Sequence, residues 1–173
     1  MSHKLVTLLL ATADATIAAN QSLSTSFGDT TVFEHCAGQL YRAINAPHYV
    51  AHAPNSLLPH CIQGIVIKSD LAEQGLALLL AEGVSRISTT KAEQIYLALP
   101  HQVELTAVDH QQLLMRHMRT TKAVCTVTDG KVGLPAIFPR TDFNKLLMLK
   151  NDSELMALLC QLPPEQQLQL GGG

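Results

Sequence analysis

The chain has 173 residues, of which 47% are hydrophobic and only 15% are charged, and its formal net charge is −2. This length suits one domain with a single core, and the scarcity of clustered basic and aromatic residues argues against a nucleic-acid-binding protein. No apolar run approaches the roughly 20 residues of a membrane span, so no membrane association is expected. Little charge over much apolar surface favours a homodimer or another protein partner.

The first half of the chain is predicted to alternate short strands with two helices. The first helix is predicted because its apolar residues recur at spacings of three and four. Ser69 or Asp70 is expected to cap the second helix, which Gly83 would end. The expected strands are Lys4–Leu10, Tyr49–Ala51 and Ile65–Ile67, and the expected helices are Thr31–Asn45 and Leu71–Glu82.

The second half continues the same alternation. Thr106 is expected to cap a helix, and Asp129-Gly130 is a pair typical of a tight hairpin turn. The tail Pro163–Gly173 is rich in Gln and ends in three glycines, so it is expected to be flexible. The expected elements are strands at Ile95–Leu99, Ala123–Thr128 and Ala136–Phe138, and helices at Ala107–Arg119, Asp142–Met148 and Asp152–Gln161.

The order of these elements predicts the fold class. Strands that alternate with helices of this length indicate repeated βαβ units, and right-handed crossovers place helices on both faces of such a sheet. The expected fold is therefore α/β, with three α/β/α layers around a mainly parallel twisted sheet, and is Rossmann-like. Residues 1–162 form the expected domain and residues 163–173 its flexible tail.

The cysteines are scattered singly and form no CxxC pair. Single cysteines in apolar surroundings are typical of reduced thiols in a core, and therefore of a cytoplasmic protein. The four positions are Cys36, Cys61, Cys125 and Cys160.

Two histidines have a spacing that could indicate a metal site. His48 and His52 are four residues apart, and on a helix this spacing lets two imidazoles share a metal ion. Pro47 and Pro54 bracket them, so a strand or loop is favoured here and no metal site is assigned.

The loop after the first strand carries a family resemblance. This region reads LATADATIAANQS, then LSTSFGD and TTVFEH. It resembles the MobA-like family, which includes the molybdopterin guanylyl- and cytidylyltransferases and whose members carry a loop of the form LAAGxSxRxGxxK. Leu10 and Ala11 match this pattern. The family's functional Gly, Ser, Arg, Gly and Lys fall on Ala13, Ala15, Ile17, Ala19 and Ser22.

The carboxyl-terminal third carries the most specific part of the resemblance. Residues 130–140 read GKVGLPAIFPR and are similar to the family's R-x-G-H-P-x-L-F-x-R segment, with Phe143 and Asp152 following at matching spacing. Residues 97–106 read LALPHQVELT and are similar to the family's L-A-D-Q-P-x-V-T at the Leu-Ala start and at Thr106. They differ in that about two extra residues lie between these points and that Leu99 replaces the metal-binding Asp. The resemblance covers about residues 4–160 and implies a nucleotide-diphospho-sugar transferase-like fold and a link to molybdenum cofactor biosynthesis.

The substitutions remove the chemistry that the resemblance implies. Nucleotidyl transfer needs backbone N–H groups, cations and a metal-binding carboxylate around a triphosphate, and residues 11–26 contain no glycine, Lys or Arg. We therefore expect a non-catalytic homologue with a binding or regulatory role, no cofactor, and weak binding of a nucleotide or small phosphorylated ligand. Two alternatives stay open: an active Mg²⁺-dependent nucleotidyltransferase with relocated residues, and a purely structural interaction protein.

Candidate ligand-pocket residues lie in loops beyond the predicted strand ends, where open α/β sheets bind ligands. No catalytic residue is assigned. Asp70 has a second interpretation as a helix cap, and the residues that follow Pro100 have one as parts of a solvated loop. The candidate pocket residues are Asp14, Ser22, Asp70, His101, Gln102 and Gly133.

Overall fold

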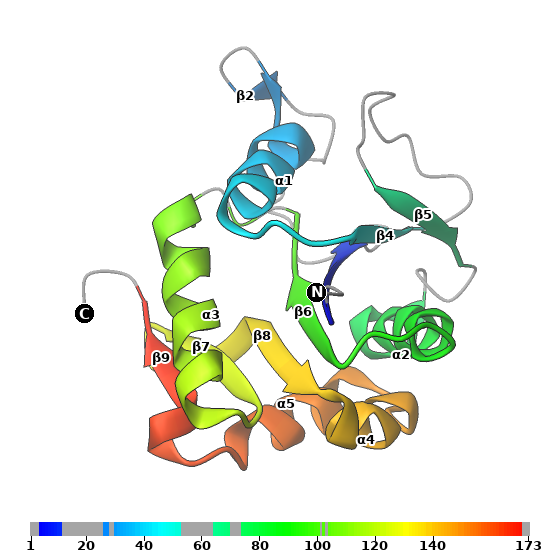
Figure 1. The fold of residues 1–173 in the computed structure, drawn as a ribbon, viewed down its shortest axis with the longest axis vertical. Coiled ribbons are helices and arrows are strands. Elements are labelled where there is room, and N and C mark those ends of the chain that lie inside the picture. Colours follow the sequence, from blue (N-terminus) through cyan, green and yellow to red (C-terminus); the bar gives the residue numbers. More distant parts are fainter. Residues whose placement is uncertain are drawn as a thin grey trace.

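The computed structural model describes residues 4–11, 26–27, 30–52, 64–69, 74–100, 102 and 104–170. A seven-stranded sheet has the strand order β5-β4-β1-β6-β8-β7-β9 (Figure 1). All neighbours in it are parallel except β8, which runs antiparallel to both β6 and β7. The strands are β1 (Leu5–Ala11), β4 (His48–His52), β5 (Ile65–Lys68), β6 (Gln94–Ala98), β7 (Val124–Thr128), β8 (Lys131–Pro139) and β9 (Gln167–Gln169), and β2 (Ser26–Phe27) pairs separately with β3 (Thr30–Thr31).

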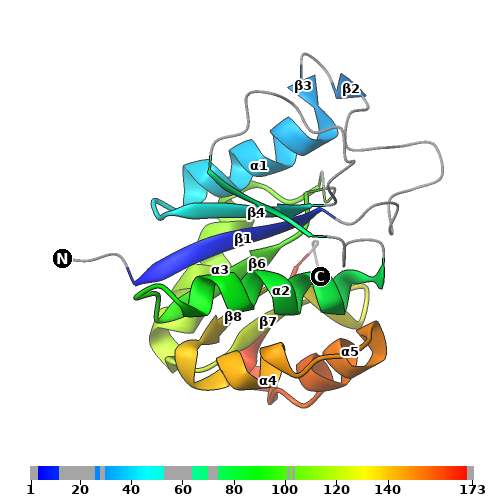
Figure 2. The same cartoon turned by 90° about the vertical axis from the view of Figure 1, so that its right-hand side faces the viewer.

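Helices cover both faces of the sheet, so the predicted three-layer α/β/α fold is confirmed. Figure 2 shows α1 on one side of β1 and β4, and α2, α4 and α5 on the other. Helix α3 packs with α1, and α2 packs with α4 and α5. The helices are α1 (Val32–Ala43), α2 (Leu76–Ser88), α3 (Ala107–Thr120), α4 (Phe143–Leu147) and α5 (Asp152–Cys160), with 3₁₀ turns at Arg140–Asp142 and Pro164–Gln166. Within the described residues, none of the helices has both the length and the apolar composition to cross a membrane.

The sheet divides the core into two apolar layers. Leu8 and Leu10 of β1 pack into the layer under α2, whereas Leu9 between them packs into the layer under α1. All three side chains are almost fully buried. A strand covered by helices on both faces has no polar side, which explains the continuous apolar run in the sequence.

Helix α2 differs from its sequence prediction at both ends. It begins at Leu76 with Gly75 as its N-cap residue, so Ser69 does not cap it. Asp70, the other predicted cap, lies outside the described residues. Gly83, predicted to end it, lies inside it and is buried. A Cβ atom at this position would lie 2.6 Å from Cδ2 of Leu8 in β1. The glycine therefore permits a close helix–strand contact, and the helix continues to Ser88.

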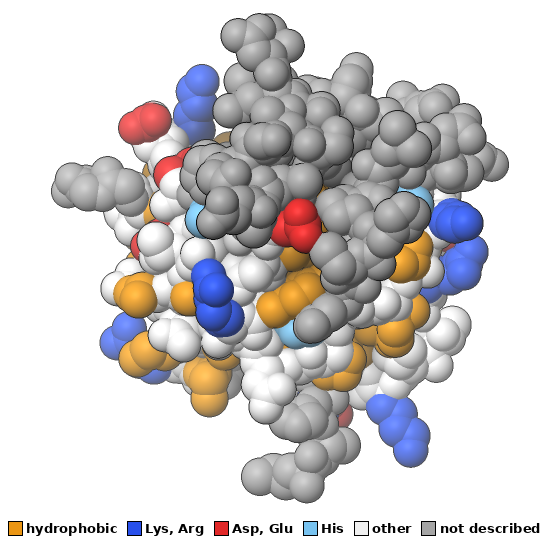
Figure 3. Space-filling model, turned by 90° about the horizontal axis from the view of Figure 1, so that it is seen from above, with side chains coloured by type: hydrophobic (Ala, Val, Ile, Leu, Met, Phe, Trp, Pro, Cys, Tyr) orange, Lys and Arg blue, Asp and Glu red, His pale blue; other side chains and the backbone are white. Residues whose placement is uncertain are grey.

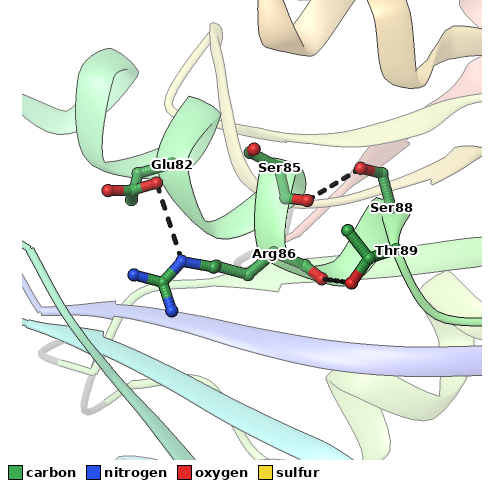
Figure 4. Close-up of polar contacts among 5 residues, drawn as sticks. All are labelled: Glu82, Ser85, Arg86, Ser88 and Thr89. Atoms are coloured by element: carbon green, nitrogen blue, oxygen red, sulfur yellow. Dashed lines mark hydrogen bonds and ion pairs between the residues drawn. The ribbon is translucent and has the colours of Figure 1, made fainter.

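Hydrogen bonds from the end of α2 and from a distant residue satisfy its last carbonyls. The Ser88 hydroxyl donates to the Ser85 carbonyl at 2.8 Å, and the Thr89 hydroxyl donates to the Arg86 carbonyl at 2.8 Å (Figure 4). The Arg140 guanidinium donates through Nη2 to the Ser88 carbonyl at 2.7 Å. Because the last four carbonyls of a helix lack partners within it, these bonds define where α2 ends.

At the other end, α2 is capped from a different helix. Oδ1 of Asp152, the first residue of α5, accepts a hydrogen bond of 2.8 Å from the backbone N–H of Ala77. The carboxylate also faces the positive end of the α2 dipole. Arg140 and Asp152 both belong to the block with the most specific family resemblance, and both stabilise the framework.

Replacing Asp152 with alanine is expected to lower the free energy of unfolding by about 1 kcal/mol, because the first turn of α2 loses its capping acceptor. Asp152→Asn keeps an acceptor oxygen and removes the charge, so it should lose less. Urea denaturation of the two variants checks this. An unchanged stability for Asp152→Ala contradicts the assigned role.

Two local sequence predictions in the second half of the chain, the Thr106 cap and the Asp129-Gly130 turn, are confirmed. Thr106 caps α3, and its side chain accepts from the Asp109 backbone while the Asp109 carboxylate accepts from the Thr106 backbone. Asp129 and Gly130 have φ angles of 53° and 80° in the β7–β8 turn. These values suit a tight hairpin whose residues need positive φ.

The tail differs from the expectation of a flexible segment. Residues 163–170 form a 3₁₀ turn and strand β9, which pairs in parallel with β7. The Gln166 side chain donates to the Ala123 carbonyl at 2.6 Å, and Arg116 of α3 donates to the carbonyls of Glu165 and Gln167. These long-range bonds give a polar segment order that its composition does not predict. Residues 171–173 lie outside the described residues.

Candidate functional site

The parallel strands β1, β4, β5 and β6 all end at the same edge of the sheet, at Ala11, His52, Lys68 and Ala98. Open α/β folds bind ligands at this edge. Of the candidate residues, Asp14, Ser22, Asp70 and His101 lie outside the described residues. The structure describes the other two, Gln102 and Gly133.

Gln102 and Gly133 line the same cavity although they lie far apart in the sequence. This cavity has a volume of about 260 Å³ and lies between the loop after β6, the β7–β8 hairpin, the start of α2 and one side of α5. The Gln102 amide nitrogen donates a 2.8 Å hydrogen bond to the carbonyl of Leu134. This hydrogen bond connects the loop after β6 to β8 and holds the Gln102 side chain in place. The side chain is therefore not simply part of a solvated loop.

The wall of this cavity is mostly apolar. Leu99 stands where the family resemblance places a metal-binding Asp, and it is half-buried and packs against the core. No acidic side chain is among the described residues that line the cavity. Its apolar wall is formed by Leu76, Leu99, Val132, Leu134, Leu155 and Leu159.

A second, smaller cavity of about 90 Å³ shares Gln102 and Leu134 with the first. Unlike the first cavity, it is lined in part by the acidic residues Glu104 and Asp109. The Asp109 carboxylate already accepts hydrogen bonds from the Thr106 N–H at 3.0 Å and from the Thr106 hydroxyl at 3.3 Å. In the part of the chain that the structure describes, no three His, Cys, Asp or Glu residues form a group able to hold a metal ion.

His48 and His52 do not form a metal pair. Both lie in strand β4, where residues four apart are roughly 13 Å from one another. Nδ1 of His48 lies 2.6 Å from the Thr7 hydroxyl, and its ring stacks on Tyr41 at 3.9 Å between centroids. Burial lowers the pKa of His48. This histidine is a packed structural residue.

A buried polar pair that was not predicted from the sequence lies beneath α3. The Tyr96 hydroxyl of β6 lies 2.7 Å from Nδ1 of His110 in α3, and both residues are almost fully buried. Burial lowers the pKa of His110 to about 4, although the nearby Asp109 opposes this shift. Burial also raises the pKa of Tyr96. Both side chains are therefore neutral near pH 7, as expected for a structural hydrogen bond within the core.

The described cysteines differ in exposure. Cys36 and Cys125 are buried, as expected for core thiols, and burial raises their pKa values to about 12 and about 11. Thiols with raised pKa values are poor nucleophiles at neutral pH. Cys160 is exposed at the end of α5, which differs from the expectation. Cys61 lies outside the described residues.

The described surface shows scattered charge. On the face in Figure 3, the Lys and Arg side chains lie apart rather than in one patch. The outer side of α3 presents Val108, Met115 and Met118, which are 58%, 60% and 68% exposed. The homodimer or other protein partner, and the exclusion of nucleic acid, remain predictions from the sequence.

Comparison with solved structures identifies the fold. Rv0371c from Mycobacterium tuberculosis matches 100% of this chain and 91% of its own, with a TM-score of 0.75 and 18% identity. A 4-diphosphocytidyl-2C-methyl-D-erythritol synthase matches 99% of this chain and 91% of its own, with a TM-score of 0.66 and 16% identity. A nucleotidyl transfer enzyme from Methanothermobacter matches 97% and 88%, with a TM-score of 0.67 and 12% identity. The chain has a nucleotidyltransferase-like fold.

The likeness is one of structure rather than of sequence. No protein-family model matches this chain, and no curated protein matches it. At such low identities, the comparisons establish the arrangement of strands and helices alone. Function has to be argued from the site.

Proposed function

We propose that this nucleotidyltransferase-like protein is a non-catalytic, MobA-like homologue that binds a ligand at the carboxyl edge of its sheet in a binding or regulatory role. The observation that carries the proposal is Leu99 at the end of β6. Where the resemblance places a metal-binding carboxylate, the chain has a half-buried apolar side chain that forms part of a cavity wall. An apolar side chain cannot coordinate Mg²⁺, which takes oxygen ligands.

The loss of charge extends to the loop after β1 in the sequence. Phosphoryl groups in a transition state are stabilised by cations and aligned N–H donors, and loss of one such donor typically costs about 3–4 kcal/mol of transition-state stabilisation. The sequence has lost the loop Arg, the loop Lys and the strand-end Asp together. These effects combined would remove nearly all catalysis by the family mechanism.

The residues that preserve the resemblance support the same proposal. Arg140 binds the carbonyls after α2, and Asp152 caps its first turn. Both have structural roles at α2. A chain that keeps framework residues while its phosphate- and metal-binding positions change is expected to keep the fold without the activity.

A second candidate function is an active metal-dependent nucleotidyltransferase with relocated ligands. A specific observation favours it: one of the similar structures, again at 18% identity and with a TM-score of 0.73, is Rv0371c in complex with manganese. Under this alternative, Asp70 is the residue that we would expect to hold the metal, because it follows β5 in the sequence.

Isothermal titration of the full chain with CTP or GTP, each with Mg²⁺ or Mn²⁺, distinguishes the two functions. We expect no metal-dependent binding with sub-millimolar affinity, and no pyrophosphate release when a molybdopterin or sugar-phosphate acceptor is added. Metal-dependent binding or turnover contradicts the proposal.

If nucleotide binding is observed, a pair of variants tests the alternative. Asp70→Asn removes the suggested metal ligand, whereas Asp129→Asn changes an exposed carboxylate in the β7–β8 turn as a matched control. Loss of binding in the first variant only would assign the metal to Asp70. Equal binding by both variants would exclude that assignment.

A further inference from the structure

Strand β5 forms one edge of the seven-stranded sheet, where β4 is its neighbour. Ile65 and Val66 at its start are large, apolar and 54% and 44% exposed, and its charged residue, Lys68, lies at its end. The strand at the opposite edge, β9, consists of Gln, Leu and Gln. Because apolar edge strands pair readily with further strands, and natural proteins usually protect them with polar residues, β5 is a candidate interaction surface.

The two exposed apolar side chains lie on opposite faces of the sheet. Ile67 packs into the core layer under α2, so Ile65 lies on the same face and Val66 on the face of α1. Helix α2 packs on β1 and β4, and Figure 2 shows β5 crossing in front of these two strands. Exposure on both faces means that β5 projects beyond the described helices, so another strand can approach it from the side.

The backbone of β5 presents hydrogen-bonding groups to such a strand. In a parallel ladder, the N–H and C=O of one residue point to the same side, and successive residues alternate. The Ser69 N–H donates to the His52 carbonyl of β4 at 2.8 Å. Ile67 therefore also faces β4, whereas Val66 and Lys68 face away from it. No hydrogen bond joins these outward groups to another described residue, and a strand added to the edge would satisfy them.

We propose that this edge pairs with β5 of a second copy of the chain, antiparallel about a two-fold axis at Val66, so that two sheets become one. In this register Val66 forms a hydrogen-bonded pair with the partner's Val66, and Ile65 lies beside the partner's Ile67. Both exposed apolar side chains thereby gain an apolar neighbour. Lys68 lies opposite the partner's Gly64, so the two lysines stay at opposite ends of the paired strands.

A second copy suits this edge better than an unrelated strand because the pairing is self-complementary. A shift of two residues, with Ile67 on the axis, would place Lys68 against the partner's Val66 and lose the apolar match. The net charge of −2 opposes self-association only weakly, and a two-fold contact covers both edges and closes the assembly. Neither Leu99 nor the cavities take part, so this inference goes beyond the proposed function and does not depend on it.

Sedimentation equilibrium of the full chain under reducing conditions tests the association. We expect the average mass to rise from 18.7 kDa towards twice that value between roughly 1 µM and 1 mM, because a small interface associates weakly. Val66→Lys places two like charges opposite each other and should weaken the dimer at least about tenfold. Met118→Lys adds the same charge at a 68% exposed position of α3 and should leave the association unchanged.

Val66→Pro tests the backbone pairing without adding charge. Proline is tolerated on an edge strand where the missing N–H would face solvent, so the ladder with β4 should persist and urea unfolding should stay close to that of the wild type. The dimer should again weaken at least about tenfold, because the outward N–H at the axis is lost. Ile67→Pro, whose lost N–H faces β4, should instead destabilise the fold.

Disulfide cross-linking tests the register. Oxidation should join two copies of Val66→Cys, because Cα atoms in such a pair are about 5.5 Å apart, within the range of roughly 4.4–6.8 Å that disulfides span. Ile65→Cys is two residues out of register, at about 8 Å, and should not cross-link. The wild type controls for the natural thiols.

Three results would each overturn the inference. The first is a mass of 18.7 kDa at every concentration of the wild type. The second is undiminished association of Val66→Lys or Val66→Pro in its folded state. The third is cross-linking of Ile65→Cys that matches or exceeds that of Val66→Cys.

Discussion

Arg140→Ala is expected to lower the free energy of unfolding by about 2–3 kcal/mol. The guanidinium donates to the carbonyls of Ala92, Ser88 and Thr90, at 2.6, 2.7 and 3.3 Å, and its carbon atom lies 5.4 Å from the centre of the Phe143 ring. Hydrogen bonds from a charged donor contribute about 1.5–3 kcal/mol each. Water can replace the donor at the exposed carbonyls of Ser88 and Thr90, so the expected total is close to the contribution of one such bond rather than of three.

Arg140→Lys is the matched control for this prediction. Lysine keeps the charge but lacks the planar fork that reaches several carbonyls at once, so we expect it to recover less than half of the lost stability. Urea denaturation at pH 7 measures both variants. A loss below about 0.5 kcal/mol for Arg140→Ala, typical of ordinary surface substitutions, would show that these bonds do not stabilise the end of α2.

Acidification is expected to destabilise the protein through His110. Burial lowers the pKa of this imidazole from 6.5 to about 4 in the folded chain. Below pH 6.5 the unfolded chain takes up a proton that the folded chain does not, so stability is present above this pH and falls as the pH drops towards 4. The two pKa values correspond to about 3 kcal/mol in total. The pKa values of His48 and His117 are also lowered, so they change stability in the same direction.

His110→Gln isolates this contribution. The variant is expected to be less stable at pH 7, because the Tyr96 hydroxyl loses its imidazole partner, but its stability should fall less between pH 6.5 and pH 4. Chemical denaturation at a series of pH values gives both curves. Parallel curves for the wild type and the variant would show that His110 does not titrate differently on folding.

Local signals predicted the strands and helices well, whereas contacts between distant residues explain the failures. Thr106 and the Asp129-Gly130 turn act through their immediate neighbours, so their roles can be read from short stretches. Gly83 was interpreted as a helix end because the contact that requires a glycine there is made with Leu8 of β1, which is distant in the sequence. The tail was interpreted as flexible because the partner that orders it, β7, is about forty residues away.

The candidate site was predicted only in outline. The edge of the sheet follows from strand order, and Gln102 and Gly133 were chosen because they follow or border predicted strands. That they line one cavity depends on β8 lying beside β6, which spacing does not reveal. The buried pair of Tyr96 and His110 was missed because a histidine in a polar helix is indistinguishable from a solvated one until its packing is known.

The contact between Gly83 and Leu8 couples two positions in the evolution of this fold. A methyl group at position 83 has no room while the leucine fills the space across from it. Among relatives that keep this helix–strand distance, the two sites should covary: a larger residue on the helix should accompany a shorter one on the strand. Neither position could then change in size independently, because selection would maintain the combined volume of the two side chains.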